Sequence, residues 1–427
     1  MRAGSPALVL LILLAVTAAG QEKKASVQQK RNEPPPGWQV KPFSIENPSS
    51  DFRLALQGYV QADFRSFPDW PSDEEDGGRH ADEFEWRRIR IGIDGRWKRL
   101  TFQVDVNPAS REIREGKELR DAWLGLRLAK ALQVRGGHMK LPVSPERLTS
   151  NAKTDFLERA AVVEALAPTR DWGVMLHGEI GRFLEYQAGV FEGDGSQSPD
   201  RAGTTAAARL VIRPARWLDL GGSYAQGEVR AEPVGGELDP TPKGFSGWSE
   251  SGFRFYQPVF VDGRRLRWGA DARIQAGPAA VWGEFLEGRE QRRSQGPTLE
   301  DLPELRGDGW SLTATWLVTG EKKTRTIRPD RSLFGGPGAV EVAVRYQELW
   351  FDDVVDDGFE SAGSRAANVR PAGFRAFTGG LSWWPSSFLR LMGNVLVERF
   401  DDALRAPEPG KDGTYVSLLG RVQVHLP

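Results

Sequence analysis

Apolar and polar residues alternate along most of the chain from residue 51 onward. Between Phe52 and Phe64 every second residue is apolar or glycine, while the positions in between are mostly polar. A later run repeats the pattern, with Ile89, Ile91 and Ile93 on one face. A period of two predicts β-strands that bury one face. Sixteen segments have this character, at about residues 52–65, 88–94, 100–106, 119–128, 131–139, 171–178, 182–192, 204–213, 216–228, 264–275, 278–288, 309–319, 338–350, 373–385, 387–400 and 413–426.

The connections between these segments alternate in length. Short ones fall at residues 95–96, 129–130, 179–181, 214–215, 277–278 and 385–386, and long polar ones at 66–83, 108–118, 140–170, 193–203, 229–263, 289–308, 351–372 and 401–412. Short periplasmic turns and long extracellular loops are typical of outer-membrane barrels. We therefore predict an all-β fold, a transmembrane antiparallel β-barrel of about 16 strands over residues 51–427, with a soluble β-sandwich as the alternative. The connection 320–337 departs from the alternation, because it is periplasmic by parity and yet long and rich in Arg and Lys.

The first fifty residues precede the predicted barrel. Met1 and Arg2 are followed by an apolar stretch that ends in small residues at 18–20. This stretch is shorter than the ~20 residues that a spanning helix requires, so it predicts a secretory signal peptide over residues 1–20. Residues 21–50 are polar and contain three consecutive prolines, which predicts a flexible periplasmic tail.

The composition removes several kinds of chemistry. The 427 residues include no Cys, which excludes thiolate metal sites, Cys nucleophiles and disulfides. The 4 His residues show no zinc-site spacing, and no Walker or nucleophile-elbow motif occurs. With 57 Lys and Arg against 58 Asp and Glu, the chain is not a globally basic nucleic-acid binder. We expect no enzyme activity, no cofactor, no metal and no nucleic-acid partner.

Basic side chains occupy positions on the polar face of the predicted strands. Arg88, Arg90 and Arg135 share the inward phase, and Arg87 lies beside them at a loop end where the phase is open. Arginines that line a pore lower the barrier for anions, because each guanidinium offers several donors to an oxyanion. The alternative is that these arginines pair with carboxylates on facing strands. Inward carboxylates are Asp63, Asp94, Asp105 and Asp121.

Seven segments form an ordered series along residues 52–427. They are RRIRIG at 87–92, GHMKLPVSPERLTS at 137–150, FLERA at 156–160, APTRDWGV at 167–174, AGVFEGDG at 188–195, WLVTGE at 316–321 and GAVEVAVRY at 338–346. Each segment alone is loose, but their order resembles the phosphate-selective porin O and P family.

The resemblance implies a homotrimeric porin of sixteen strands in the outer membrane of a Gram-negative bacterium, with a long third loop that folds into the pore. Here that loop is 140–170, and it carries Lys140, Arg147, Lys153, Arg159 and Arg170. By motif, Arg87, Arg88 and Arg159 are similar to the basic residues that give the family its phosphate selectivity. The chain differs from the family in having only two lysines in this loop, and in ending with Pro427 instead of an aromatic residue.

Together these features predict an outer-membrane porin, surrounded by outer-membrane lipid, for passive diffusion of small anions, with phosphate as the candidate solute. The predicted anion-binding residues are Arg87, Arg88, Arg90, Arg135, Lys140, Arg147, Lys153, Arg159 and Arg170. Three alternatives stay open: a plugged structural or adhesive barrel, a non-selective general porin, and a soluble secreted β enzyme.

Overall fold

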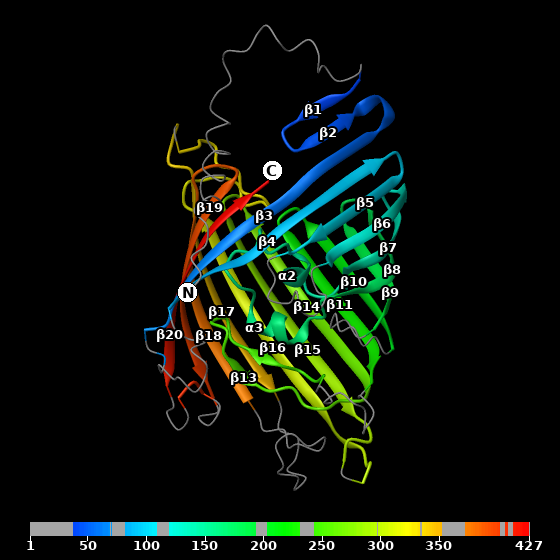
Figure 1. The fold of residues 1–427 in the computed structure, drawn as a ribbon, viewed down its shortest axis with the longest axis vertical. Helices are drawn as coiled ribbons and strands as arrows, with labels where there is room; N and C mark the ends of the chain where they lie inside the picture. Colours follow the sequence, from blue (N-terminus) through cyan, green and yellow to red (C-terminus); the bar gives the residue numbers. More distant parts are fainter. Residues whose placement is uncertain are drawn as a thin grey trace.

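The structure, a computed structural model, describes residues 37–68, 70, 82–108, 119–193, 203–230, 243–296, 298–333, 335–351, 372–401, 406–408 and 413–426. These residues form one curved sheet whose strands run obliquely around a central space (Figure 1). The predicted signal peptide at 1–20 lies outside the described residues.

Sixteen antiparallel strands of the described chain close into a barrel. They are β3 (Phe52–Ser66), β4 (Glu83–Trp97), β5 (Leu100–Val106), β6 (Leu119–Ala129), β7 (Leu132–Lys140), β8 (Arg170–Ile180), β9 (Leu184–Glu192), β10 (Thr204–Ala215), β11 (Leu218–Val229), β14 (Gly263–Ala276), β15 (Ala279–Arg292), β16 (Leu302–Leu317), β17 (Ala339–Phe351), β18 (Ala372–Trp384), β19 (Leu389–Phe400) and β20 (Thr414–His425). Closure occurs where β20 pairs with β3, with Gln423 opposite Gln61 and Leu419 opposite Arg65. A closed barrel leaves no strand edge unpaired, and the predicted fold class is confirmed.

A short hairpin precedes the barrel. β1 (Gln39–Lys41) pairs with β2 (Ser44–Asn47), and β2 pairs in turn with the start of β3. Asn47 then caps the 3-10 turn η2 (Pro48–Ser50), because its side chain accepts a hydrogen bond from the Ser49 amide at 3.2 Å. The described end of the predicted tail thus contains two strands and a 3-10 turn, since strands of three and four residues are too short to show a period of two, and residues 21–36 of that prediction lie outside the described residues.

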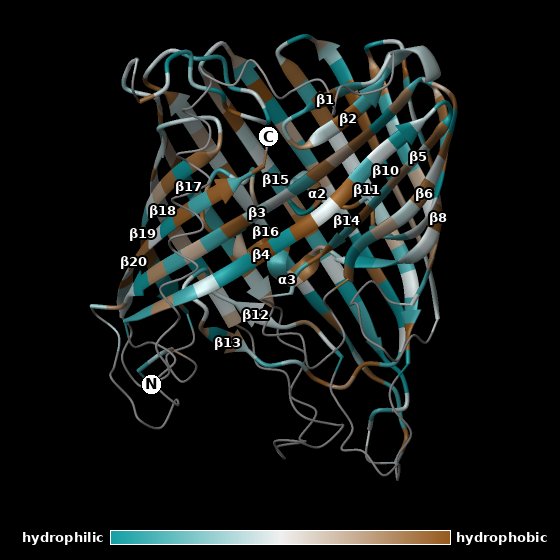
Figure 2. Ribbon diagram, turned by 45° about the horizontal axis from the view of Figure 1, so that its top comes forward, coloured by the Kyte–Doolittle hydropathy of each residue, from teal (hydrophilic) through white to brown (hydrophobic). Residues whose placement is uncertain are grey.

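The two faces of the strands carry different residues, as Figure 2 shows by the alternation of colours along them. Leu56, Ile91 and Val104 are exposed on the outer face, whereas Gln61 is fully buried on the inner one. Trp97 and Trp217 are also exposed, and both lie beside short turns. An outer apolar face with aromatic residues at its margin matches a hydrocarbon layer bounded by headgroups.

The connection between β7 and β8 lies inside the barrel and includes the short helices α2 (Pro145–Leu148) and α3 (Ala161–Leu166) (Figure 1). Its anchors come from the far wall. The Ser144 hydroxyl donates to the Glu284 carboxylate at 3.0 Å, and the Ala161 amide donates to the Gln347 side chain at 2.6 Å. Gly309 on β16 faces α3 so closely that a Cβ there would meet Val162 at 2.9 Å. We name residues 141–169 the inner loop.

An apolar cluster fills part of the lumen beside the inner loop. It includes β13 (Arg254–Tyr256), which pairs with β12 (Gly247–Trp248) in the connection between β11 and β14. Phe255 stacks on Phe374 at 5.0 Å, and Tyr256 stacks on Phe351 at 4.0 Å. Among the described residues, no helix has the length and apolar character needed to cross a membrane.

Candidate functional site

A β-bulge in β4 directs two consecutive arginines into the lumen. Gln61 lies opposite Arg88, but the next residue of β3, Ala62, lies opposite Trp86, so Arg87 is the extra residue. A bulge of this kind lets two neighbouring side chains share one side of the sheet. Arg87 and Arg88 therefore both reach the inner loop. The sequence left the direction of the Arg87 side chain open, and in the structure it faces inward.

Glu158 of the inner loop is the common acceptor for four arginines of the barrel wall. Its carboxylate lies 2.9 Å from Arg87, 3.0 Å from Arg88, 3.1 Å from Arg65 and 3.5 Å from Arg421. Burial acts to raise the pKa of Glu158, but the surrounding guanidinium groups hold that pKa well below its usual range. The carboxylate is therefore charged at neutral pH, and it ties the inner loop to β3, β4 and β20.

Two further predicted residues hold the inner loop together from within. Arg147 and Arg159 both pair with Glu164, at 2.9 Å and 3.3 Å. Arg159 also donates to the backbone oxygens of Glu146 and Thr149. Both arginines are buried. Their guanidinium groups bond to atoms of the inner loop itself, so little of either side chain is accessible to a solute in the lumen.

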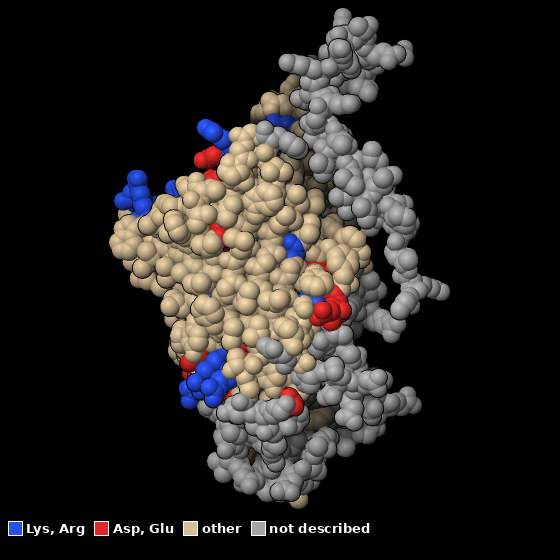
Figure 3. Space-filling model, turned by 90° about the vertical axis from the view of Figure 1, so that its left-hand side faces the viewer, with Lys and Arg blue, Asp and Glu red and all other residues tan. Residues whose placement is uncertain are grey.

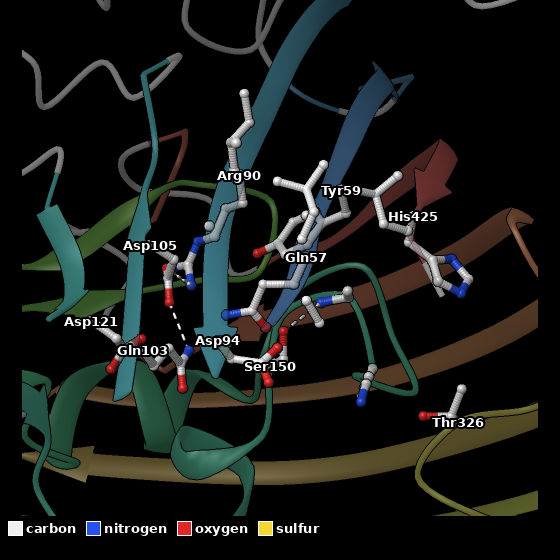
Figure 4. A pocket seen from close by; sticks show the side chains of 18 of the residues that line it. Gln57, Tyr59, Arg90, Asp94, Gln103, Asp105, Asp121, Ser150, Thr326 and His425 are labelled. Carbon is white, nitrogen blue, oxygen red and sulfur yellow. Dashed lines mark hydrogen bonds and ion pairs between the residues drawn. The ribbon is translucent and has the colours of Figure 1, made fainter. Parts of the chain in front are cut away.

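The other five predicted residues line a cavity of about 700 Å³ between the inner loop and strands β3–β7. They are Arg90, Arg135, Lys140, Lys153 and Arg170. Figure 4 shows Arg90 and Gln103 directed toward Asp105. Each donates a hydrogen bond to that carboxylate, Arg90 at 3.4 Å and Gln103 at 2.9 Å.

Three of these five cations are already engaged. Arg90 pairs with Asp105, and Arg170 pairs with Asp121 at 2.9 Å. The Lys140 ammonium donates to two loop carbonyls, those of Leu148 and Thr149. The alternative, in which inward arginines pair with carboxylates of the barrel wall, therefore holds for Arg90 and Arg170.

Arg135 and Lys153 differ from the rest, because neither forms an ion pair with any described residue. The Arg135 guanidinium lies 5.4 Å above the Trp123 ring. Lys153 is exposed at the surface of the inner loop. Burial and the nearby Arg325 lower the pKa of Lys153. Both Arg135 and Lys153 also line a second cavity of about 450 Å³.

The connection between β16 and β17 supplies cations that the sequence did not assign to the site. The Lys323 ammonium in this segment bonds to Asp155 of the inner loop at 2.7 Å and to Glu341 of β17. Arg325 lines the second cavity and Arg328 lines the first, and neither forms an ion pair within the described part of the chain. The sequence feature that could have identified these cations is the unexpected length and basic composition of residues 320–337. Over the described residues, no group of three or more His, Asp or Glu side chains is placed to hold a metal ion.

Solved structures with the same architecture are outer-membrane proteins. OmpT of Vibrio cholerae matches with a TM-score of 0.55 and 10% identity, covering 88% of this chain and 98% of that one. The anion-selective porin from Comamonas acidovorans matches with 0.52 and 12%, covering 88% and 100%. OmpF of Salmonella typhi, in complex with daunomycin, matches with 0.53 and 11%, covering 88% and 99%. An uncharacterized protein of Aquifex aeolicus is 22% identical over 208 residues, which span 43% of this chain and 48% of that protein's length.

A closed barrel of sixteen antiparallel strands, with these structural neighbours, is the fold of outer-membrane porins. The chain belongs to the phosphate-selective porin O and P family, whose sequence profile matches residues 54–424. In barrels of this kind long connections are extracellular and short turns periplasmic, so the long β16–β17 connection, which lies at the same end of the barrel as the short turns, is the exception. Family and fold are those of a channel.

Proposed function

We propose that this porin is a passive diffusion pore that prefers small anions, with phosphate as the candidate solute. The observation that carries the proposal is a group of four cavity-lining cations without an ion partner in the described chain: Arg135, Lys153, Arg325 and Arg328. They lie on three separate elements, a strand, the inner loop and the β16–β17 connection, and all four line the two cavities. Asp105 and Asp121 are paired with Arg90 and Arg170, so their negative charge is largely compensated and acts weakly on a passing ion.

Confinement makes these charges effective. A cation that faces a narrow, partly desolvated path acts on a passing ion more strongly than the same charge at a hydrated loop tip. Lys153 and Arg135 border both cavities, so an ion that moves between the two passes them. Arg325, in the β16–β17 connection, lines the second cavity together with Lys153. We assign selectivity first to Arg135, Lys153 and Arg325.

The remaining predicted residues take a different part in the proposal. Arg87, Arg88, Arg147 and Arg159 hold the inner loop in place, while Arg90, Lys140 and Arg170 line the path with their charges partly compensated. The homotrimer stays a prediction from the family resemblance.

The test is the reversal potential in planar bilayers under a salt gradient. The double variant Lys153→Gln/Arg325→Gln should shift the reversal potential toward cation preference, because it removes two uncompensated charges and keeps side-chain size. The control is Arg182→Gln/Arg216→Gln, which removes two exposed arginines from the periplasmic turns and should shift it much less. Phosphate should reduce chloride current in the wild type. If both double variants keep wild-type selectivity, the pore is a general one.

A second candidate, the plugged structural or adhesive barrel, is favoured by one observation. The aromatic cluster around Phe255, Phe374 and Phe400 fills part of the lumen next to the inner loop. A barrel closed by this cluster would give no stepwise conductance in the same bilayers, whereas a pore gives steps of reproducible size.

A further inference from the structure

The first cavity, of about 700 Å³, is much larger than an inorganic phosphate ion. Seven basic and three acidic side chains line it, together with amide and aromatic side chains. An inorganic anion uses only the cations of such a wall, because carboxylates repel it and aromatic rings offer it little. The mixed lining therefore indicates a larger ligand, in which an anionic group is joined to an uncharged polar part.

One side of this cavity is formed by polar and aromatic residues in cross-strand register. Asp94 lies directly opposite Gln103, and Gln103 lies opposite Trp123, so strands β4, β5 and β6 place the three side chains in one row on the inner face. Gln57 of β3 lies beside this row, opposite Gly92. Figure 4 shows Gln57, Asp94 and Gln103 on the same side of the cavity. We name Gln57, Asp94, Gln103 and Trp123 the β3–β6 patch.

The β3–β6 patch borders a second hollow as well. Its four residues also line a third cavity, of about 310 Å³, which therefore adjoins the first. Gly92 lines the first cavity next to the patch, and a Cβ at this position would meet the Asp105 Cβ at 2.5 Å. Only glycine fits there, so no side chain covers the wall between Gln57 and Asp105.

The patch has hydrogen-bonding capacity that the described chain does not use. The Gln57 amide nitrogen and the Tyr59 hydroxyl, both in the wall of the first cavity, are buried without a hydrogen-bond partner among the described residues. The terminal torsion of a glutamine is soft, so this amide turns toward a ligand at small cost. Asp94 accepts from Arg53 at 3.2 Å, yet its side chain remains 34% exposed. Hydroxyl groups both donate and accept, so a polyhydroxylated ligand suits a wall of amides and a carboxylate.

A basic group lies next to the patch. The Arg135 guanidinium is 5.4 Å from the Trp123 ring, and Arg135, Lys153 and Arg328 line the first cavity without an ion partner in the described chain. A phosphate monoester carries about −1.5 to −2 charges at pH 7, and a guanidinium binds its oxygens with paired donors. The Trp123 ring thus lies between a phosphate-binding end and a hydroxyl-binding end, and it offers apolar surface to the C–H groups of a sugar.

We propose that the first cavity binds a sugar phosphate, with the phosphate at Arg135, Lys153 and Arg328 and the sugar hydroxyls at the β3–β6 patch. The proposal rests on the proposed anion pore and names hydroxylated organic phosphates as its substrate class. Inorganic anions use only the basic end of this site. Figure 3 shows an outer face of the barrel whose charged side chains lie mainly toward its ends, so a polar ligand of this kind reaches the cavity along the lumen and not through the wall.

The test is block of the chloride current through the purified porin in planar bilayers. The probes are glucose 6-phosphate, glucose, inorganic phosphate, and cyclohexyl phosphate, which resembles the sugar phosphate in size and lacks hydroxyls. We expect glucose 6-phosphate to reach half-block at a concentration about tenfold below that of inorganic phosphate or cyclohexyl phosphate, because its hydroxyls bond to the patch. Glucose alone should not block at that concentration, because it leaves the basic end unused.

Two variants locate the sugar end. Gln57→Leu removes an amide whose nitrogen has no partner to lose, and Trp123→Leu removes the ring. Each should bring the half-blocking concentration of glucose 6-phosphate close to that of inorganic phosphate. The ratio of the two concentrations is the readout, because Trp123→Leu also removes the ring beneath Arg135. The controls Gln133→Leu and Trp217→Leu change the same residue types outside the three cavities and should keep the wild-type ratio.

The outcomes separate this site from the pore itself. Equal half-block by glucose 6-phosphate and inorganic phosphate in the wild type overturns the sugar-phosphate site, and so does equal block by cyclohexyl phosphate. A wild-type ratio in Gln57→Leu or Trp123→Leu also overturns it, with heat-dependent electrophoretic migration as the check that each variant is folded. In all three cases a retained chloride preference in the reversal potential leaves the proposed function standing. A reversal potential without anion preference overturns the proposed function instead.

Discussion

At the scale of single residues, partners decide what a lumenal arginine can do. Arg88 and Arg135 both lie on inward strand positions, and strand periodicity does not distinguish them. In the structure Arg88 contacts Glu158, whereas the Arg135 guanidinium lies over the Trp123 ring and near the Met175 sulfur and pairs with no carboxylate of the described residues. Long-range contacts of this kind depend on where the inner loop lies, and periodicity carries no information about that.

Glu158 offers the sharpest test at this scale. The change Glu158→Gln should cost about 3–5 kcal/mol of unfolding free energy, because it leaves a buried cluster of guanidinium groups without its counter-charge. It should also move the reversal potential toward anions, since the freed cations add to the lumenal field. Denaturant unfolding and bilayer recordings measure the two effects.

The matched control for Glu158 is Glu158→Asp, which keeps the charge and shortens the side chain. It should lose less stability than Glu158→Gln and leave selectivity near that of the wild type. Wild-type stability in Glu158→Gln would mean that the four arginines do not depend on this carboxylate.

At the scale of elements, strand periodicity predicts the barrel well and its irregular parts poorly. All sixteen strands lie where period-two runs indicate them, because each must present one apolar and one polar face. The hairpin β1–β2 was missed because it is too short for the pattern. Trp383 and Trp384 end β18, but consecutive strand residues face opposite ways, and Trp384 is buried against Arg390.

The strand phases can be tested with two charged replacements. Ile91 is exposed on the outer face near the middle of β4, so Ile91→Arg should destabilise the barrel in lipid by about 2–4 kcal/mol. Gln103 lines the lumenal cavity, so Gln103→Arg should change conductance and leave stability close to that of the wild type. Unfolding in lipid vesicles and single-channel recording separate the two. Equal destabilisation by both changes would mean that the assigned phases are wrong.

At the scale of the whole molecule, the charges nearly cancel, with 57 basic and 58 acidic side chains, yet their distribution is uneven. The sequence predicts that the long connection 140–170 and the basic stretch 320–337 are unusual. It does not predict that Lys323 joins them through Asp155, because that contact spans 168 residues of chain. The candidate path therefore needed the three-dimensional arrangement, whereas strand phase and family motifs name part of its basic wall: Arg90, Arg135, Lys140, Lys153 and Arg170.

The last prediction concerns how selectivity depends on salt. Lys153, Arg325 and Arg328 are exposed to the cavities, so mobile ions can approach and screen them. The screening length falls from about 10 Å at 0.1 M salt to about 3 Å at 1 M. We therefore expect the preference for chloride over potassium to decline over this range in the wild type, while Lys153→Gln/Arg325→Gln starts near neutral selectivity and changes little. Zero-current potentials at a fixed concentration ratio and rising mean concentration measure this. A wild-type preference that stays constant to 1 M would instead assign selectivity to a narrow contact that excludes mobile ions, and Arg135 over the Trp123 ring would then be the residue to replace first.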